Sequence, residues 1–220
     1  MIKNWQYHTL KIISWLVSLL PYRIILYGGK MLGRLYFHLA GRQRRRALAQ
    51  MTAGLGISPA AAGKIVRSLF EKLGQTFMEV MYMPVLRPDN INRFVRIENG
   101  HYLAEAVAGG RGVVLLTAHI GNWEWLGASL AMNKFPLTSL IKRQPNEQYT
   151  RILNEYRQMV GIEIFARGTA ELVGAARALK QGKILGFLAD QDAGASGIFV
   201  KFLGRMASTP LGPAVFARRF

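Results

Sequence analysis

The stretch GVVLLTAHIGNWEW, residues 112–125, carries the pattern that decides the fold. Its first six residues form a short apolar run with the length and composition of a buried β-strand. His119 follows this run, and Asn122 is a residue type that caps a helix beginning at the next position. Because ligand sites in open α/β sheets lie at the carboxyl ends of the strands, the pattern predicts a functional histidine at such an edge.

The sequence on either side repeats this alternation of short apolar runs and amphipathic helices. We expect strands at residues 94–97, 112–117, 136–141, 162–166 and 183–188. We expect helices at residues 101–108, 123–132, 146–160 and 169–180, and an earlier helix that starts at Ser58 and Pro59. This alternation indicates an α/β fold with a mostly parallel sheet flanked by helices. A length of 220 residues leaves room for one such domain and an N-terminal appendage.

The N-terminal appendage is apolar and basic. Residues 10–20 form the run LKIISWLVSLL, Pro21 interrupts it, and residues 22–39 resume it with embedded charges. The run is shorter than the roughly 20 apolar residues of a straight spanning helix, and no signal-peptide cleavage site follows it. Arg23, Lys30 and Arg34 would share one helix face opposite apolar residues, which is typical of an interfacial helix. We therefore predict a membrane-associated helical segment at residues 1–40 and the α/β domain at residues 41–220. A single-pass anchor and a buried helical hairpin are the alternatives for the first segment.

The charge of the chain favours a membrane partner. There are 29 Lys and Arg against 12 Asp and Glu, a net charge of +17, and the first acidic residue is Glu71. Basic segments are attracted to anionic head groups, and the arginine cluster at residues 42–46 suits the cytosolic side. Long apolar runs and the absence of a nucleic-acid-binding motif argue against nucleic acid as a partner. With no cysteine, a thiolate nucleophile and a disulfide framework are excluded.

Glu124 falls in the first turn of the helix predicted after His119. A turn through Ile120 and Gly121 could bring its carboxylate back to the imidazole. A carboxylate bonded to one ring nitrogen fixes the tautomer and raises the basicity of the other, which makes His119 a general base for a hydroxyl. The alternative is an ordinary polar histidine at a strand end. We expect no metal, because His119 and Glu124 are too few ligands for zinc.

The string TAHIGNWEW resembles the His-x4-acid motif of the lysophospholipid acyltransferase superfamily. Its glutamate with an adjacent tryptophan is similar to the late acyltransferases of lipid A biosynthesis, whereas the glycerolipid branch typically has aspartate. Three further blocks resemble the same branch: KRQPN at residues 142–146, ARGTAELVGAARALKQGK at residues 166–183, and ADQDAGASGIFVKFLGRMASTPLG at residues 189–212. The resemblance covers most of the chain from residue 112 onward.

This resemblance implies an O-acyltransferase that moves a fatty acyl chain from acyl carrier protein or coenzyme A to a hydroxyl of a glycolipid such as a lipid A precursor. His119 would be the base and Glu124 its partner. Substrate-binding roles are implied for Asn122, Arg143, Arg167, Asp190, Gln191 and Asp192. The alternative for Arg143 and Arg167 is a solvated surface charge. The alternative for Asp190, Gln191 and Asp192 is a cluster of turn-forming residues. A thioester is already activated, so no cofactor is expected, and the implied place is the cytosolic side of a bacterial inner membrane.

Two features depart from the family pattern. The phosphate-binding block of the glycerolipid branch, which contains Glu, Gly and Arg, cannot be found, so we do not expect a lysophosphatidic acid acceptor. Residues 214–220 fall within an expected amphipathic helix, where family members continue with further strands, and we expect the acyltransferase domain to be incomplete at the C-terminus. An acyltransferase for another glycolipid or lysophospholipid, and a non-catalytic membrane-binding fragment, are the alternatives.

Overall fold

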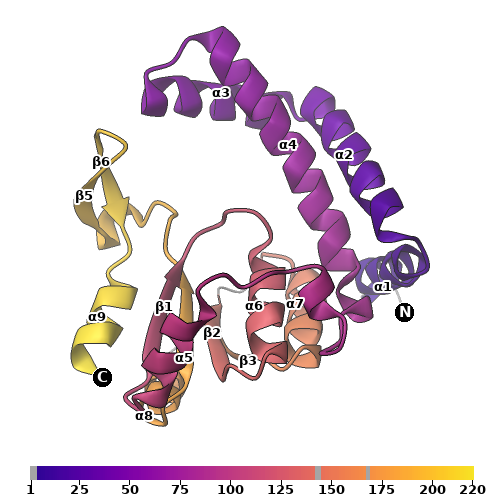
Figure 1. The fold of residues 1–220 in the computed structure, drawn as a ribbon. Helices are drawn as coiled ribbons and strands as arrows, with labels where there is room; N and C mark the ends of the chain where they lie inside the picture. Colours follow the sequence, from indigo (N-terminus) through magenta and orange to yellow (C-terminus); the bar gives the residue numbers. More distant parts are fainter. Residues whose placement is uncertain (1–3, 142–144, 167–168) are drawn as a thin grey trace.

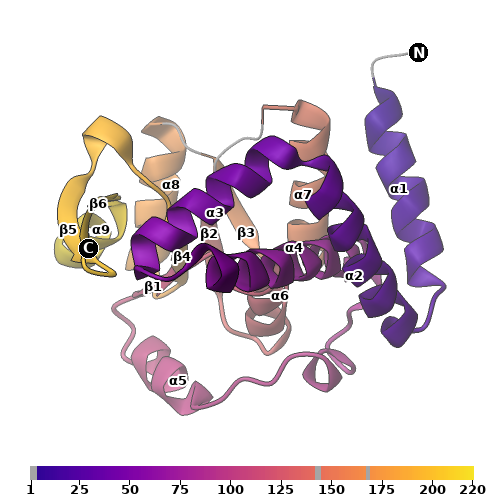
Figure 2. The same ribbon diagram turned by 90° about the horizontal axis from the view of Figure 1, so that it is seen from above.

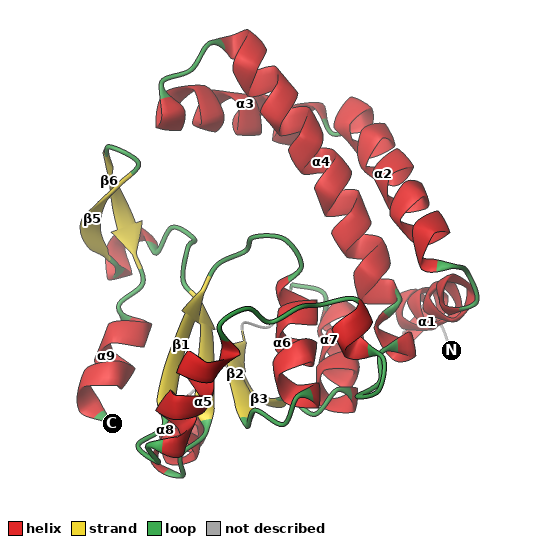
Figure 3. Ribbon diagram, in the orientation of Figure 1, coloured by secondary structure: helices red, strands yellow, loops and turns green. Residues whose placement is uncertain are grey.

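The computed structural model describes residues 4–141, 145–166 and 169–220. A group of N-terminal helices precedes an α/β unit (Figures 1 and 3). The helices are α1 (Trp5–Ser18), α2 (Tyr22–Leu39), α3 (Gly41–Leu55), α4 (Pro59–Met81), α5 (Gly100–Ala108), α6 (Trp123–Met132), α7 (Glu147–Met159), α8 (Thr169–Lys180) and α9 (Gly212–Arg219), with short 3-10 helices η2 (Met83–Val85), η3 (Ile91–Arg93) and η4 (Gly194–Ser196). The strands are β1 (Val113–Thr117), β2 (Leu137–Ile141), β3 (Glu163–Ala166), β4 (Ile184–Leu188), β5 (Ile198–Phe202) and β6 (Arg205–Thr209).

The central sheet confirms the predicted fold class. Strands β1 to β4 pair in parallel in the order β1-β4-β2-β3. Alternate residues of β4 serve opposite faces: Ile184 joins the core cluster with α6 and α7, while Leu185 and Phe187 join the cluster with α8 and α9. Both faces of the sheet are therefore covered by helices, as parallel sheets require.

The strand expected at residues 94–97 is wrong. This segment follows η3 as irregular backbone, and Phe94 packs edge-on against Trp125 and Tyr22. The apolar side chains of this segment anchor a loop to the core instead of forming one face of a sheet. A short apolar run indicates burial in both cases, so the sequence pattern does not distinguish a buried loop from a strand. The antiparallel hairpin of β5 and β6 was not predicted as secondary structure.

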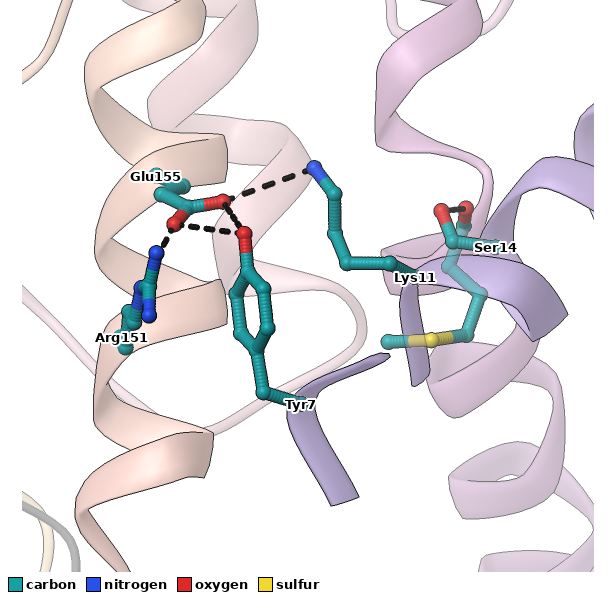
Figure 4. A network of polar contacts seen from close by, with 6 residues as sticks. Tyr7, Lys11, Ser14, Arg151 and Glu155 are labelled. Carbon is teal, nitrogen blue, oxygen red and sulfur yellow. Dashed lines mark hydrogen bonds and ion pairs between the residues drawn. The ribbon is translucent and has the colours of Figure 1, made fainter. Parts of the chain in front are cut away.

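The predicted break at Pro21 separates α1 from α2, and α1 docks on α7 (Figure 4). The Tyr7 hydroxyl donates to both carboxylate oxygens of Glu155, at 2.9 and 2.8 Å, and Arg151 and Lys11 pair with the same carboxylate. On the same face of α1, the Ser14 hydroxyl donates to the Met81 carbonyl at the end of α4. These contacts fix one face of α1 and leave the opposite face outside the core.

Helix α2 packs along α4 with little space between the two backbones. Gly29 and Gly33 of α2 and Gly74 of α4 are buried where the helices meet. A Cβ on Gly33 would overlap the carbonyl oxygen of Phe70, and a Cβ on Gly74 would overlap that of Gly29. The close approach of these helices therefore depends on glycine at these positions.

We expect Gly74→Ala to destabilise the chain by about 1–3 kcal/mol, because the added methyl group meets backbone that cannot move aside without separating α2 from α4. Thermal or denaturant unfolding measures the loss. Gly63→Ala, in the same helix with open space around its Cβ, is the matched control and should be neutral or stabilising by up to about 1 kcal/mol. Equal stability of the two variants would contradict this packing.

The basic face predicted for residues 22–39 is partly paired with an acidic side chain of α4. The Glu71 carboxylate accepts a hydrogen bond from Arg34 at 2.6 Å and lies 3.6 Å from the Lys30 ammonium group. Two of the three basic residues predicted to share this face therefore have a protein partner. Within the described residues, no helix has both the length and the apolarity needed to cross a bilayer. Membrane association of residues 1–40, and the boundary after residue 40, stay predictions.

Candidate active site

The turn between β1 and α6 holds His119 at the carboxyl end of the sheet. Gly121 has φ +62°, a conformation that glycine adopts without strain, and it redirects the chain into α6. Asn122 caps the helix as predicted: its Oδ1 accepts from the Trp125 backbone N–H at 3.0 Å. Because Thr117 of β1 is paired with Leu188 of β4, the residues after β4 reach the same edge as His119.

Asp190, two residues beyond β4, binds His119 through both of its carboxylate oxygens. Its Oδ1 lies 2.7 Å from His119 Nδ1, and its Oδ2 accepts from the His119 backbone N–H at 2.9 Å. Partial burial raises the pKa of the Asp190 carboxyl, but the hydrogen bonds from the His119 side chain and backbone outweigh this, and the net pKa lies below its usual value. An ionised Asp190 selects the tautomer with hydrogen on Nδ1, so Nε2 is left as a proton acceptor.

The carboxylate of Glu124 has a different partner from the one predicted. It is buried in the first turn of α6, where it accepts from Arg157 Nε at 2.8 Å, Arg157 Nη2 at 2.5 Å and Trp123 Nε1 at 3.2 Å. The Trp123 ring lies between the two sites, edge-on to the imidazole at 4.8 Å. The predicted pairing of His119 with Glu124 is thus replaced by two pairs, His119 with Asp190 and Glu124 with Arg157. The reason is that α7 presents a guanidinium to Glu124, while β4 delivers Asp190 to the imidazole.

Glu79 of α4 joins the N-terminal helices to this turn. Its carboxylate accepts from the Tyr22 hydroxyl at 2.6 Å and from Asn122 Nδ2 at 2.9 Å, and its carbonyl accepts from Trp125 Nε1 at 2.9 Å. Burial and the bond to Glu79 raise the pKa of Tyr22 far above its usual range, so the phenol stays protonated and donates. The Tyr22 and Trp125 rings also stack at 5.7 Å. Helices α2 and α4 are therefore attached directly to the His119 turn.

A groove of about 880 Å³ runs between these helices and the turn. The side chains of α2 and α4 that line it include Leu26, Ile65 and Leu69, with Lys72, Gln75 and Thr76 as polar groups. His119 and residues 120–122 line it from the β1–α6 turn. This volume is in the range of ligand sites in proteins. The arrangement presents a proton-accepting imidazole to a largely apolar groove, and this suits a hydroxyl carried by a lipid.

Comparison with known proteins identifies the family. The model of the bacterial lipid A biosynthesis acyltransferase family matches residues 1–220. The chain belongs to this family.

Curated relatives of the chain carry the name phosphatidylinositol mannoside acyltransferase. The protein from Mycobacterium tuberculosis strain H37Rv is 29% identical over 194 residues, which is 84% of this chain and 60% of the relative. That from Mycolicibacterium smegmatis is 28% identical over 179 residues, 80% of this chain and 58% of the relative. The chain thus spans about 60% of the length of these lipid A acyltransferase family members.

The structure gives different surroundings to the other residues for which family resemblance implied substrate binding. Both polar atoms of the Asn122 side chain are bonded within the protein. Asp192 accepts from the Gly194 N–H at 3.0 Å, which is the turn alternative, and Gln191 is exposed. Arg143 and Arg167 lie outside the described residues. The catalytic and substrate-binding roles of all these family residues stay predictions.

Sequence reasoning missed Glu79, Tyr22 and Arg157 as parts of the site. They come from α4, α2 and α7, far from residues 112–125 in the chain. In the sequence, Arg157 is one of several charged residues of an amphipathic helix, and its spacing does not mark it as part of the site. Glu79 has a faint signal, since it is one of the first acidic residues of a strongly basic chain and lies on an otherwise apolar helix.

We expect Asp190→Asn to lower the rate of acyl transfer by about 10²–10⁴-fold, because an amide no longer enforces the tautomer that leaves Nε2 free.

The lowered pKa of the Asp190 carboxyl also predicts that the stability of the fold depends on pH. The ionised carboxylate stabilises the fold above its unfolded pKa of about 3.9, and this contribution is lost as the pH falls through the lower folded pKa. The difference in unfolding free energy between wild type and Asp190→Asn should therefore shrink as the pH falls below about 4. A difference that does not shrink on acidification below this pH would contradict the pairing.

Proposed function

We propose that this chain carries the acyl-transfer site of a membrane-bound glycolipid O-acyltransferase. The observation that supports it most is the pairing of His119, which lines the groove, with Asp190, which binds Nδ1 and so leaves Nε2 as the proton acceptor. Family membership and the names of the relatives point to the same reaction class. The donor in this proposal is a fatty acyl thioester of acyl carrier protein or coenzyme A.

In the proposed reaction, the acceptor hydroxyl donates its proton to His119 Nε2 as its oxygen attacks the thioester carbonyl. Asp190 stabilises the imidazolium that forms, as the carboxylate of a catalytic triad does. The tetrahedral oxyanion would lie near the positive end of α6, whose first turn begins beside His119. Collapse of this intermediate breaks the carbon–sulfur bond, and the imidazolium returns its proton to the departing thiolate. The ester forms with no net proton change and no cofactor.

Two classes of acceptor are compatible with this chemistry, and experiment can separate them. A lipid A precursor is the acceptor that the sequence motifs imply. A mannosylated phosphatidylinositol is the acceptor that the relatives' name indicates for those proteins. Both are anionic glycolipids with free hydroxyl groups, and Lys72 is a cation in the groove that could attract either phosphate.

The proposed site of action is the cytosolic face of a bacterial inner membrane. The outer face of α1 carries a row of exposed apolar side chains that includes two tryptophans: Trp5, Ile12, Trp15, Leu16 and Leu19. Tryptophan is favoured at the head-group level of bilayers, and the exposed Arg42, Arg45 and Arg46 of α3 would attract anionic lipid or an acidic carrier protein. We call the α1 row the N-terminal apolar face.

A radiolabelled acyl-transfer assay tests the proposal. Each donor, acyl carrier protein thioester or coenzyme A thioester, is combined with each acceptor class in mixed micelles. Labelled glycolipid that depends on His119 would support the proposal and identify donor and acceptor together. Absence of product with every pair, from a protein that is folded and binds vesicles, would favour the non-catalytic membrane-binding alternative.

A further inference from the structure

The β5–β6 hairpin exposes apolar side chains on both of its faces. Phe202 on one face is 62% exposed, and Phe199 and Met206 on the other are 67% and 63% exposed. All five residues of β5 are exposed. A two-stranded hairpin is marginally stable in water by itself, and a soluble protein rarely leaves such a contiguous apolar surface without a partner.

The turn of the hairpin places an apolar residue at its tip. Leu203 and Gly204 connect the strands with φ values of +48° and +76°, the pattern of a type I′ turn. Asparagine or aspartate is favoured at the first of these positions, and leucine is strained there. Leu203 is 59% exposed, so packing against the described residues does not account for it. A leucine at this position is better explained by a partner that the tip enters.

The charges on the hairpin and in the residues that follow it have one sign. Residues 193–220 contain Lys201, Arg205, Arg218 and Arg219 and no acidic residue. Lys201 and Arg205 lie within two residues of the turn, one on each strand. An apolar tip flanked by cations is complementary to an anionic bilayer, where the tip enters the acyl boundary and the cations meet phosphates.

The hairpin also lies on the same side of the sheet as the N-terminal helices. Figure 1 shows that α4 and the hairpin both extend beyond the end of β1 that leads to His119, and Figure 2 shows from above that the hairpin and α1 lie at opposite ends of the molecule. The groove that contains His119 is lined by α4 residues on this side of the sheet. A bilayer touching the hairpin would therefore lie on the side of the sheet that holds the groove.

We propose that the β5–β6 hairpin inserts Leu203 and Phe202 into the interfacial region of anionic membranes, as a membrane contact separate from the N-terminal apolar face. This extends the proposed function, because it assigns the orientation of the groove toward the bilayer. Two contacts on separate elements restrict rotation of the enzyme on the surface, whereas α1 alone would leave it free to turn.

The absence of cysteine allows a site-specific test. Leu203→Cys, Trp15→Cys and Val173→Cys, the last on the exposed face of α8, are each labelled with an environment-sensitive fluorophore. Vesicles contain either equal parts phosphatidylglycerol and phosphatidylcholine or phosphatidylcholine alone. We expect a blue shift and quenching by bromine-labelled lipid for the Leu203→Cys label on the anionic vesicles, and no change for the Val173→Cys label.

Charge substitutions give a second test. Lys201→Gln and Arg205→Gln should each weaken binding of the protein to anionic vesicles about fivefold. Lys134→Gln, at the opposite edge of the sheet, should leave this binding unchanged.

The outcomes separate this proposal from the proposed function. A response of the Trp15→Cys label without one from Leu203→Cys would overturn the hairpin contact and leave membrane association intact. A label on Leu203→Cys that is shielded before vesicles are added, together with a doubled mass by light scattering, would show that a second copy covers the hairpin and would also overturn the proposal. Silence of both labels would contradict both membrane contacts, while the acyl-transfer assay in micelles would still report on the chemistry.

Discussion

Replacement of His119 by alanine is expected to lower acyl transfer by at least about 10²–10⁴-fold, the usual contribution of a general base. The acceptor hydroxyl holds its proton far too tightly to attack a thioester without a base, and His119, whose Nδ1 is bound by Asp190, is the proposed base among the groove-lining residues. The measurement is the initial rate of labelled glycolipid formation at saturating donor. Binding of the donor and of vesicles should be unchanged, because the side chain is a minor part of either surface.

His101→Ala is the matched control for this experiment. His101 lies exposed on α5, where its ring contacts only Tyr102 among the aromatic contacts of the described residues, and its loss should leave the rate unchanged. Circular dichroism of both variants establishes that the fold is intact. Turnover by folded His119→Ala at the rate of His101→Ala would refute the assignment of the base.

The largest effect on stability is expected from Arg157→Met. The Glu124 carboxylate and the Arg157 guanidinium are both largely buried, with side-chain exposures of 8% and 16%. Removal of the arginine leaves a buried carboxylate with the Trp123 indole as its remaining donor, and breaking such a pair costs about 3–5 kcal/mol. For a chain of this size, the melting temperature should fall by roughly 10 °C, given about 2–4 °C per kcal/mol.

Two further variants give this prediction its control. Arg151→Met, on the same helix, removes an exposed pair with Glu155 and should cost no more than about 1 kcal/mol. The double variant Glu124→Gln with Arg157→Met should recover most of the lost stability, since no buried charge remains. If the double variant is as unstable as Arg157→Met, the cost does not come from the uncompensated carboxylate.

The same double variant separates two roles for Glu124. Turnover near that of the wild type would assign Glu124 to the attachment of α6 to α7. A folded double variant as inactive as His119→Ala would instead support the catalytic role that the His-x4-acid spacing predicts. The structure raises this question because Glu124 pairs with Arg157 and His119 pairs with Asp190.

Local sequence patterns were sufficient to predict much of the secondary structure of the α/β unit. The apolar run at residues 112–117, the cap at Asn122 and the proline-led start at residues 58 and 59 each depend on neighbours within a few residues, and all three are observed. The strand expected at 94–97 failed because an apolar run indicates burial without saying whether a sheet or a loop is buried. Asp190 follows the strand predicted at residues 183–188, and the pairing of this strand with β1 places Asp190 at the edge of the sheet that holds His119.

By itself, the sequence determined the secondary structure around His119, the basic and apolar character of the N-terminal helices, and the edge of the sheet where chemistry could occur. These follow from periodicity, capping and charge, which are local properties. Only the tertiary structure decided which carboxylate meets the imidazole, which cation neutralises Glu124, and that Glu79 joins the helices to the turn. Each of these pairs spans 33 to 71 residues along the chain, and their formation depends on how β4, α7 and α4 pack, which short-range patterns do not encode.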